Sequence, residues 1–184
     1  MGSRSLTADV DLFDERRARP LAGAGALRRY QLNVIAANVP DVVASIGGWL
    51  FDRNAAGWDV NVLLHGDHNR QPLRILGVGS HELDPWLSRV DRGQQRGVEL
   101  AVASDLRGTD KRIEAEVRDA LRSGDIEVVQ WGAAQSPERS DCVEHQLSAA
   151  ARMFKRHALA AVCLTNAPVG ASETLWRSSE RGRM

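Results

Sequence analysis

The sequence has few cysteines, no net charge and no long apolar run. Its 184 residues include 2 cysteines, and 24 Lys and Arg residues balance 24 Asp and Glu residues. A balanced charge creates no overall field that attracts nucleic acid or an anionic membrane, so we expect neither as a partner. No apolar segment approaches the roughly 18 residues of a membrane span, and no charged-then-apolar leader is present. These absences predict a cytoplasmic protein.

The common catalytic signatures are also missing. The sequence contains no P-loop lysine, no GxSxG elbow, no CxxC pair and no HExxH motif, which excludes the commonest nucleotide hydrolases, α/β-hydrolases and zinc proteases. Cys142 and Cys163 fall near the two ends of one predicted helix. Because that spacing is too long for a disulfide, we expect them to be free, packed thiols.

The clearest pattern present is one βαβ unit between Val34 and Gly66. Residues 34–37 are all apolar and predict a strand buried on both faces. Asn38 is the expected N-cap of the following helix, with Asp41 in its first turn. Gly57 is expected to end the helix, and residues 58–65 then predict a second strand. A crossover through a helix implies that the two strands are parallel.

Two glycines interrupt the apolar stripe of that helix. Gly47 and Gly48 each cost about 1 kcal/mol relative to alanine inside a helix, so we expect them to allow a close approach of the helix to the sheet.

The rest of the sequence continues the alternation of strands and helices. Further strands are predicted at 73–78, 98–103 and 126–131, and further helices at 83–90, 110–122 and 143–161. Residues 1–29 are expected to form a flexible extension, 30–166 the domain and 167–184 a polar tail. The prediction is a single Rossmann-like, three-layer α/β domain, with a mostly parallel sheet of about five strands and helices on both faces.

In such folds, ligands bind at the carboxyl ends of the strands. The polar residues expected at these ends are Asn38, Asp41, His65, Asp67, His68, Ser104 and Asp105. The loop with His65, Asp67 and His68 has residue types that bind a divalent metal, although it also fits a solvated loop. Asp105 could accept a ribose hydroxyl, act as a base, or simply cap the next turn.

A glycine-bearing turn at 77–82 is a further candidate. Its backbone could approach a phosphate, but the dinucleotide pattern requires a third glycine where Glu82 stands. A turn that needs positive φ explains Gly77 equally well.

The stretch VIAANVPDVVASIGGWLFDRNAAGWDVNVLLHGD, from Val34 to Asp67, resembles the opening of the N-acetylglucosaminyl-phosphatidylinositol deacetylase-like family. That family begins with a strand, an AHPDDE motif and a helix bearing Gly-Gly. The resemblance implies a zinc-dependent amide hydrolase acting on N-acetylated sugars. Without a gap, the family's histidine ligand falls on Asn38, its catalytic aspartate on Pro40 and its metal-binding aspartate on Asp41.

The resemblance therefore implies a related scaffold with a degenerate metal motif. Proline cannot act as a base, and asparagine is a poor zinc ligand. The family's second ligand loop, of HPDH type, corresponds to SPERSD at 136–141, which has no histidine. His145 follows inside the predicted last helix.

Three functions follow from these observations. The first is a non-catalytic protein that binds a small ligand or a protein partner and needs no cofactor. The second is a metal-dependent, N-deacetylase-like hydrolase that holds zinc in a rearranged site of Asp41, His65 and His68. The third is a nucleotide- or sugar-nucleotide-binding enzyme that uses the 77–82 turn and Asp105. A homo-oligomer, formed through an edge strand or the last helix, is compatible with all three.

Overall fold

The computed structural model describes residues 30–66, 68–88, 99–132 and 140–178. They form a seven-stranded sheet in the order β3-β2-β1-β4-β5-β7-β6. The strands are β1 (Gln31–Ala36), β2 (Asp59–Leu64), β3 (Gly79–Glu82), β4 (Glu99–Ala103), β5 (Glu127–Trp131), β6 (Ser140–Gln146) and β7 (Ser172–Ser178). The first five strands are parallel to one another, whereas β7 is antiparallel to both β5 and β6.

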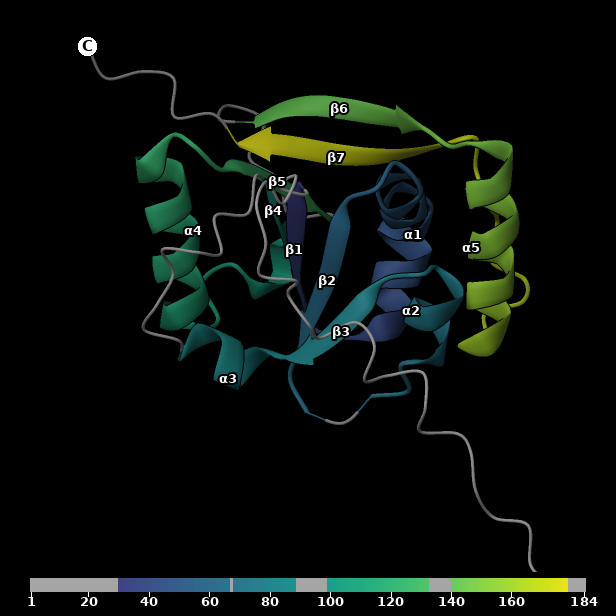
Figure 1. Cartoon of the computed structure of the whole chain (residues 1–184), viewed down its shortest axis with the longest axis horizontal. Coiled ribbons are helices and arrows are strands. Elements are labelled where there is room, and N and C mark those ends of the chain that lie inside the picture. The colour runs from purple at the N-terminus through teal and green to yellow at the C-terminus, as the bar shows by residue number, and fades with distance from the viewer. Residues whose placement is uncertain (1–29, 67, 89–98, 133–139, 179–184) are drawn as a thin grey trace, which may run out of the picture.

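Helices cover both faces of the sheet, so the domain has three layers (Figure 1). One face carries α1 (Val39–Ala55), α2 (Gln71–Ile75) and α5 (Ala149–Ala161), and the other carries α3 (Leu83–Leu87) and α4 (Lys111–Ser123). Each pair of layers encloses its own apolar cluster. In the described part of the chain, no helix combines the length and apolarity needed to cross a bilayer. The predicted three-layer α/β class is confirmed.

The first βαβ unit forms as the sequence predicts. The Asn38 side chain caps α1 by accepting a hydrogen bond from the Asp41 amide at 2.8 Å. After the helix, Gly57 adopts a φ of +88°, a conformation that favours glycine. Strands β1 and β2 then pair in parallel.

The predicted strand at 73–78 is wrong. Residues 71–75 form the short helix α2, and β3 follows at 79–82. Leu73 and Leu76 are both fully buried, and their three-residue spacing suits one side of a helical turn. Gly77, with a φ of +75°, ends that turn.

The predicted long helix at 143–161 is also wrong in its first part. Residues 140–146 form strand β6, and α5 begins only at Ala149. Ser148 caps α5 by accepting a hydrogen bond from the Ala151 amide at 3.0 Å. Cys142 therefore lies on a strand and Cys163 lies after α5; both thiols are free but exposed, not packed.

The segment 167–184, expected to be a polar tail, contains β7, which lies between β5 and β6 in the sheet. The sheet therefore has seven strands rather than about five. The predicted extension at 1–29 lies outside the described residues.

A buried ion pair attaches β7 and α5 to the middle of α1. Lys155 Nζ lies 2.5 Å from Glu173 Oε1, and the two residues are 3% and 5% exposed. Glu173 accepts hydrogen bonds from the amides of Gly48 and Trp49 at 2.9 and 2.7 Å, while Lys155 donates to the Ala44 carbonyl at 2.6 Å. In a regular helix the Gly48 amide would donate to that same carbonyl. The ion pair thus gives hydrogen-bond partners to the Gly48 amide and to the Ala44 carbonyl oxygen.

Gly48 is needed at this contact. A Cβ at Gly48 would lie 2.6 Å from both terminal carbons of Leu147 and 3.1 Å from Glu173 Oε1. The close approach expected from the sequence is therefore made to β7 and to the residue after β6.

Candidate functional site

The carboxyl ends of β1, β2, β4 and β5 lie at one edge of the sheet, because these strands are parallel. Asp41, in the first turn of the helix after β1, is hydrogen-bonded to a residue at the end of β5. Its carboxylate accepts a hydrogen bond from Trp131 Nε1, at the end of β5, at 2.9 Å and another from Ser45 Oγ at 3.1 Å. Asn38, at the end of β1, uses its side-chain oxygen to cap α1. Both predicted residues are at the predicted edge, and both are engaged in holding the fold.

His65 follows β2 and belongs to a charged network. Its Nδ1 lies 3.3 Å from Asp84 Oδ2, and Arg112 Nη1 lies 2.8 Å from Asp84 Oδ1. Arg112 also contacts Asp110 at 2.8 Å. Hydrogen bonds from Arg112 lower the pKa of Asp84 and hold the pKa of Asp110 at about 2. Both carboxylates are therefore ionised at neutral pH, and Arg112 balances one of their two negative charges.

His68 does not share this network through its ring. Its Nε2 hydrogen-bonds the backbone carbonyl oxygen of His65. Asp67, predicted between them as a ligand, lies outside the described residues.

The end of β4 presents the other two predicted residues differently. Ser104 is 6% exposed and packs beneath Gly132. A Cβ on Gly132 would lie 2.5 Å from Ser104 Oγ, and the φ of Gly132 is +106°. Asp105 is exposed on the short 3₁₀ turn Ser104–Leu106. Of the pair, only Asp105 is presented to solvent.

A second arginine at this edge is also neutralised. Arg107 Nε lies 2.7 Å from Glu114 Oε1, which also accepts the Gly108 amide at 2.9 Å. The hydrogen bond from Arg107 is the main reason why the pKa of Glu114 is lowered. Sequence reasoning missed this pair and Arg112, because nothing in the spacing indicates which carboxylates the arginines meet.

The residues at this edge do not fit a zinc centre. Within the ranges that the structure describes, no group of three or more His, Cys, Asp or Glu side chains is gathered so that it could hold a metal ion. Asp41, His65 and His68 are therefore not brought together as a ligand set. Zinc requires three or four such ligands around one point.

The turn at 77–82 does not form a phosphate loop leading into a helix. His81 lies on β3, where its Nε2 is 3.0 Å from Asn61 Oδ1. The helix that follows, α3, has 5 residues. Gly77 is explained by its positive φ, as the alternative interpretation predicts.

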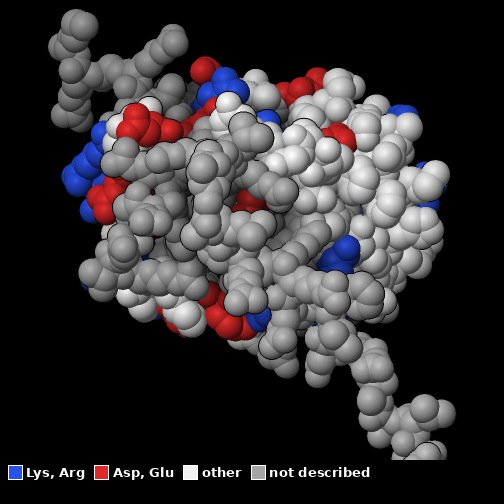
Figure 2. All heavy atoms as spheres, in the orientation of Figure 1, with Lys and Arg blue, Asp and Glu red and all other residues white. Residues whose placement is uncertain are grey.

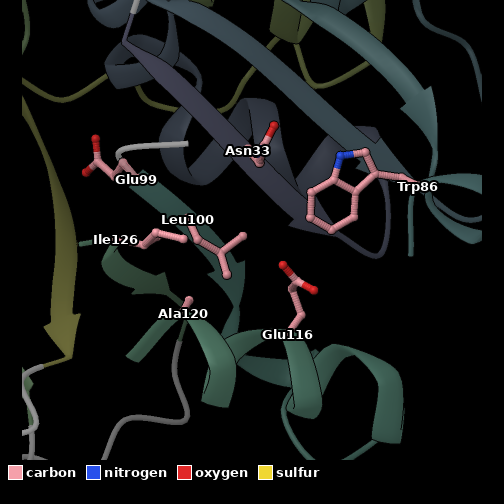
Figure 3. A pocket seen from close by; sticks show the side chains of 7 residues that line it. All are labelled: Asn33, Trp86, Glu99, Leu100, Glu116, Ala120 and Ile126. Carbon is pink, nitrogen blue, oxygen red and sulfur yellow. The ribbon is translucent and has the colours of Figure 1, made fainter. Parts of the chain in front are cut away.

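A small cavity lies away from this edge, between the sheet and α3 and α4. Its volume is about 30 Å³, enough for one or two water molecules but not for a metabolite. Seven residues line it (Figure 3): Asn33, Trp86, Glu99, Leu100, Glu116, Ala120 and Ile126.

Glu99 is the most perturbed acid in the described residues. It is 3% exposed, and burial raises its pKa to about 7 in spite of Arg53, whose Nη2 lies 3.2 Å from Oε2. The Arg53 guanidinium lies 4.3 Å from the ring centre of Trp58. Figure 3 shows the Glu99 carboxylate turned away from Glu116 and Trp86. Glu99 lies within the strand predicted at 98–103, and only its charge within a buried run could have singled it out.

Several solved structures share this fold. A deacetylase in complex with teicoplanin, from the teicoplanin biosynthesis pathway, matches with a TM-score of 0.58 and 14% identity, over 83% of this chain and 100% of that chain. An antimicrobial pseudoaglycone deacetylase matches with a TM-score of 0.57 and 13% identity, over 85% and 100%. The zinc-inhibited form of teicoplanin deacetylase matches with a TM-score of 0.52 and 15% identity, over 83% and 100%.

The sequence itself matches no protein-family model and no curated protein. At these identities the structural likeness concerns the fold alone. The chain has the fold of the teicoplanin deacetylases. Among the residues that the structure describes, the side chains at the strand ends do not form a metal-binding group.

Proposed function

We propose that this chain is a non-catalytic binding protein built on a deacetylase fold, and that it binds its ligand at the carboxyl edge of the sheet. One observation carries the proposal: the Asp41 carboxylate is bound by Trp131 and Ser45. This is the one residue where the resemblance puts a metal-binding carboxylate.

The chemistry of amide hydrolysis supports this interpretation. A catalytic zinc needs several protein ligands, an open position for water and a base to activate that water. Here Asn38 stands where the family has histidine, and its oxygen already accepts the Asp41 amide. Pro40 stands at the position of the base and has no group that accepts a proton.

The charges at this edge favour a neutral, polar ligand. Arg107 is paired with Glu114, and Arg112 with Asp84 and Asp110. Neither arginine is free to neutralise a phosphate, so a nucleotide is the weaker candidate. The exposed Asp105 and the half-exposed His65 can hydrogen-bond hydroxyl groups. A carbohydrate-like ligand with several hydroxyls suits such groups best.

The test combines an activity assay with a binding assay on the full chain. We expect no acetate release from N-acetylglucosamine derivatives with equimolar zinc, and the same result for Asp41→Asn. In ligand-observed NMR with a panel of neutral sugars and nucleotides, we expect binding that Asp105→Ala weakens and that a chelator leaves unchanged. Acetate release that Asp41→Asn abolishes would overturn the proposal.

A metal-dependent hydrolase is the second candidate. Its support is that deacetylase structures match over their whole length. It would require Asp41 to leave Trp131 and to meet His65 and His68 around one zinc ion. A rise of several degrees in Tm with one equivalent of zinc, lost in His68→Ala, would favour this candidate over the first.

A further inference from the structure

The outer side of α5 exposes an apolar surface that the described part of the chain does not cover. Four residues at helical spacing form this outer face: Ala150, Met153, Phe154 and His157. Met153 is 58% exposed and Phe154 is 40% exposed. Phe154 stacks on Phe51 of α1 at 4.6 Å between ring centres, so the apolar surface continues onto α1. Large exposed apolar side chains that lie together are typical of a binding surface.

This face carries charge of one sign only. Arg152 and Arg156 lie along one side of it on α5 and are exposed, and Arg74 is exposed on the neighbouring α2. No Asp or Glu occurs anywhere from 147 to 172. Figure 2 shows the right-hand side of the molecule, where α5 lies, as mostly uncharged with basic groups towards its edge. An occupant should therefore combine apolar side chains with negative charge.

A second copy of α5 does not fit this description. Two such faces would bring Arg152 and Arg156 of one chain towards the same arginines of the other, and like charges across an interface are unfavourable.

One segment of the same chain has the required composition. Residues 9–15, DVDLFDE, alternate apolar side chains (Val10, Leu12 and Phe13) with acidic ones (Asp9, Asp11, Asp14 and Glu15), without a basic residue. We propose that this acidic segment docks on the outer face of α5 in its own chain.

The start of the described domain allows this docking. Tyr30 stacks on Trp58 at 5.2 Å, and Arg53 of α1 lies over the same Trp58 ring. The residue before Arg53, Asp52, accepts a hydrogen bond from the amide of Ser148, the N-cap of α5, at 3.1 Å. The chain thus enters the domain beside the end of α1 that contacts the beginning of α5.

The linker is long enough. Residues 16–29 span up to roughly 50 Å when extended, whereas α5 with its 13 residues is only about 20 Å long. Tethering also keeps the local concentration of the segment in the millimolar range, which favours docking within the chain over docking between chains.

The methionines provide a direct test on the full chain. Peroxide oxidation of Met153 can be followed by peptide mass spectrometry, with Met184 as an internal reference. The test variant carries Asp9→Asn, Asp11→Asn, Asp14→Asn and Glu15→Gln. We expect Met153 to oxidise roughly tenfold faster in this variant, which corresponds to about 1.4 kcal/mol of docking free energy. Met184 should oxidise at the same rate in both proteins.

The arginines provide the reciprocal test. Arg152→Glu with Arg156→Glu should accelerate Met153 oxidation to the same extent, whereas Lys111→Glu on α4 should leave it unchanged. Equal Met153 rates in the wild-type chain and the acidic-segment variant would overturn the proposal. It would also be overturned by protection of Met153 that disappears on dilution, since a second molecule would then cover the face.

Discussion

The buried pair of Lys155 and Glu173 makes the sharpest prediction about stability. Each residue is at most 5% exposed, and removing one partner leaves the other charge buried and unpaired, which typically costs about 3–5 kcal/mol. We therefore expect Lys155→Met and Glu173→Gln each to lower the free energy of unfolding by about 3–5 kcal/mol. That is a large share of the roughly 5–15 kcal/mol of an ordinary domain.

The double variant separates this mechanism from a simple packing loss. With both charges absent, only part of the hydrogen bonding at Gly48, Trp49 and Ala44 is lost, so the double variant should lose about 1–3 kcal/mol. Urea unfolding followed by tryptophan fluorescence measures all three. Lys111→Met, at an exposed position of α4, is the matched control and should change stability by less than about 0.5 kcal/mol. Additive losses in the double variant, or a loss below about 1 kcal/mol in Lys155→Met, would refute the reasoning.

Two further predictions concern stability. Gly47→Ala should raise the free energy of unfolding by up to about 1 kcal/mol, because the added Cβ meets nothing closer than 3.4 Å. Gly48→Ala should instead lower the free energy of unfolding by about 1–3 kcal/mol, because the added Cβ clashes with Leu147. Equal urea midpoints for the two variants would contradict this contrast. The raised pKa of Glu99, about 7, means that the folded state binds more protons than the unfolded state between pH 4.5 and 7. The free energy of unfolding should therefore fall as pH rises through this window, by up to about 3 kcal/mol. In thermal melts, the Tm of Glu99→Gln should depend less on pH than the Tm of the wild-type chain. The same dependence of Tm on pH in both proteins would rule this out.

Local signals in the sequence predicted the first βαβ unit well. Asn38 has a side chain that caps a helix, and Gly57 permits positive φ. These properties act within a few residues, so they can be read without knowing the rest of the chain.

The prediction of the fold after residue 140 failed because the determinants of this part are distant in the sequence. The residues of β7 form a strand between β5 and β6, and Glu173 is fixed by Lys155 and by amides of α1 that lie more than 100 positions earlier. Val143 in β6 and Leu147 just after it have a four-residue spacing that also suits a helix, and only pairing with β7 decides between a helix and a strand.

The sequence predicted where the candidate site residues lie, but not which side chains they bond to. Parallel strands place Asn38, Asp41 and His65 at one edge, which follows from topology alone. The bonds from Trp131 to Asp41 and from Arg112 to Asp84 depend on side chains that meet across the sheet, and no spacing in the sequence encodes such meetings.

Calorimetric titration of the full chain with zinc tests the central claim most directly, since that claim concerns what Asp41 and its neighbours can bind. With the Asp41 carboxylate held by Trp131 and Ser45, we predict no stoichiometric zinc binding that depends on Asp41, and identical titrations for the wild-type chain and Asp41→Asn. One zinc ion bound per chain, and lost in Asp41→Asn, would contradict the account.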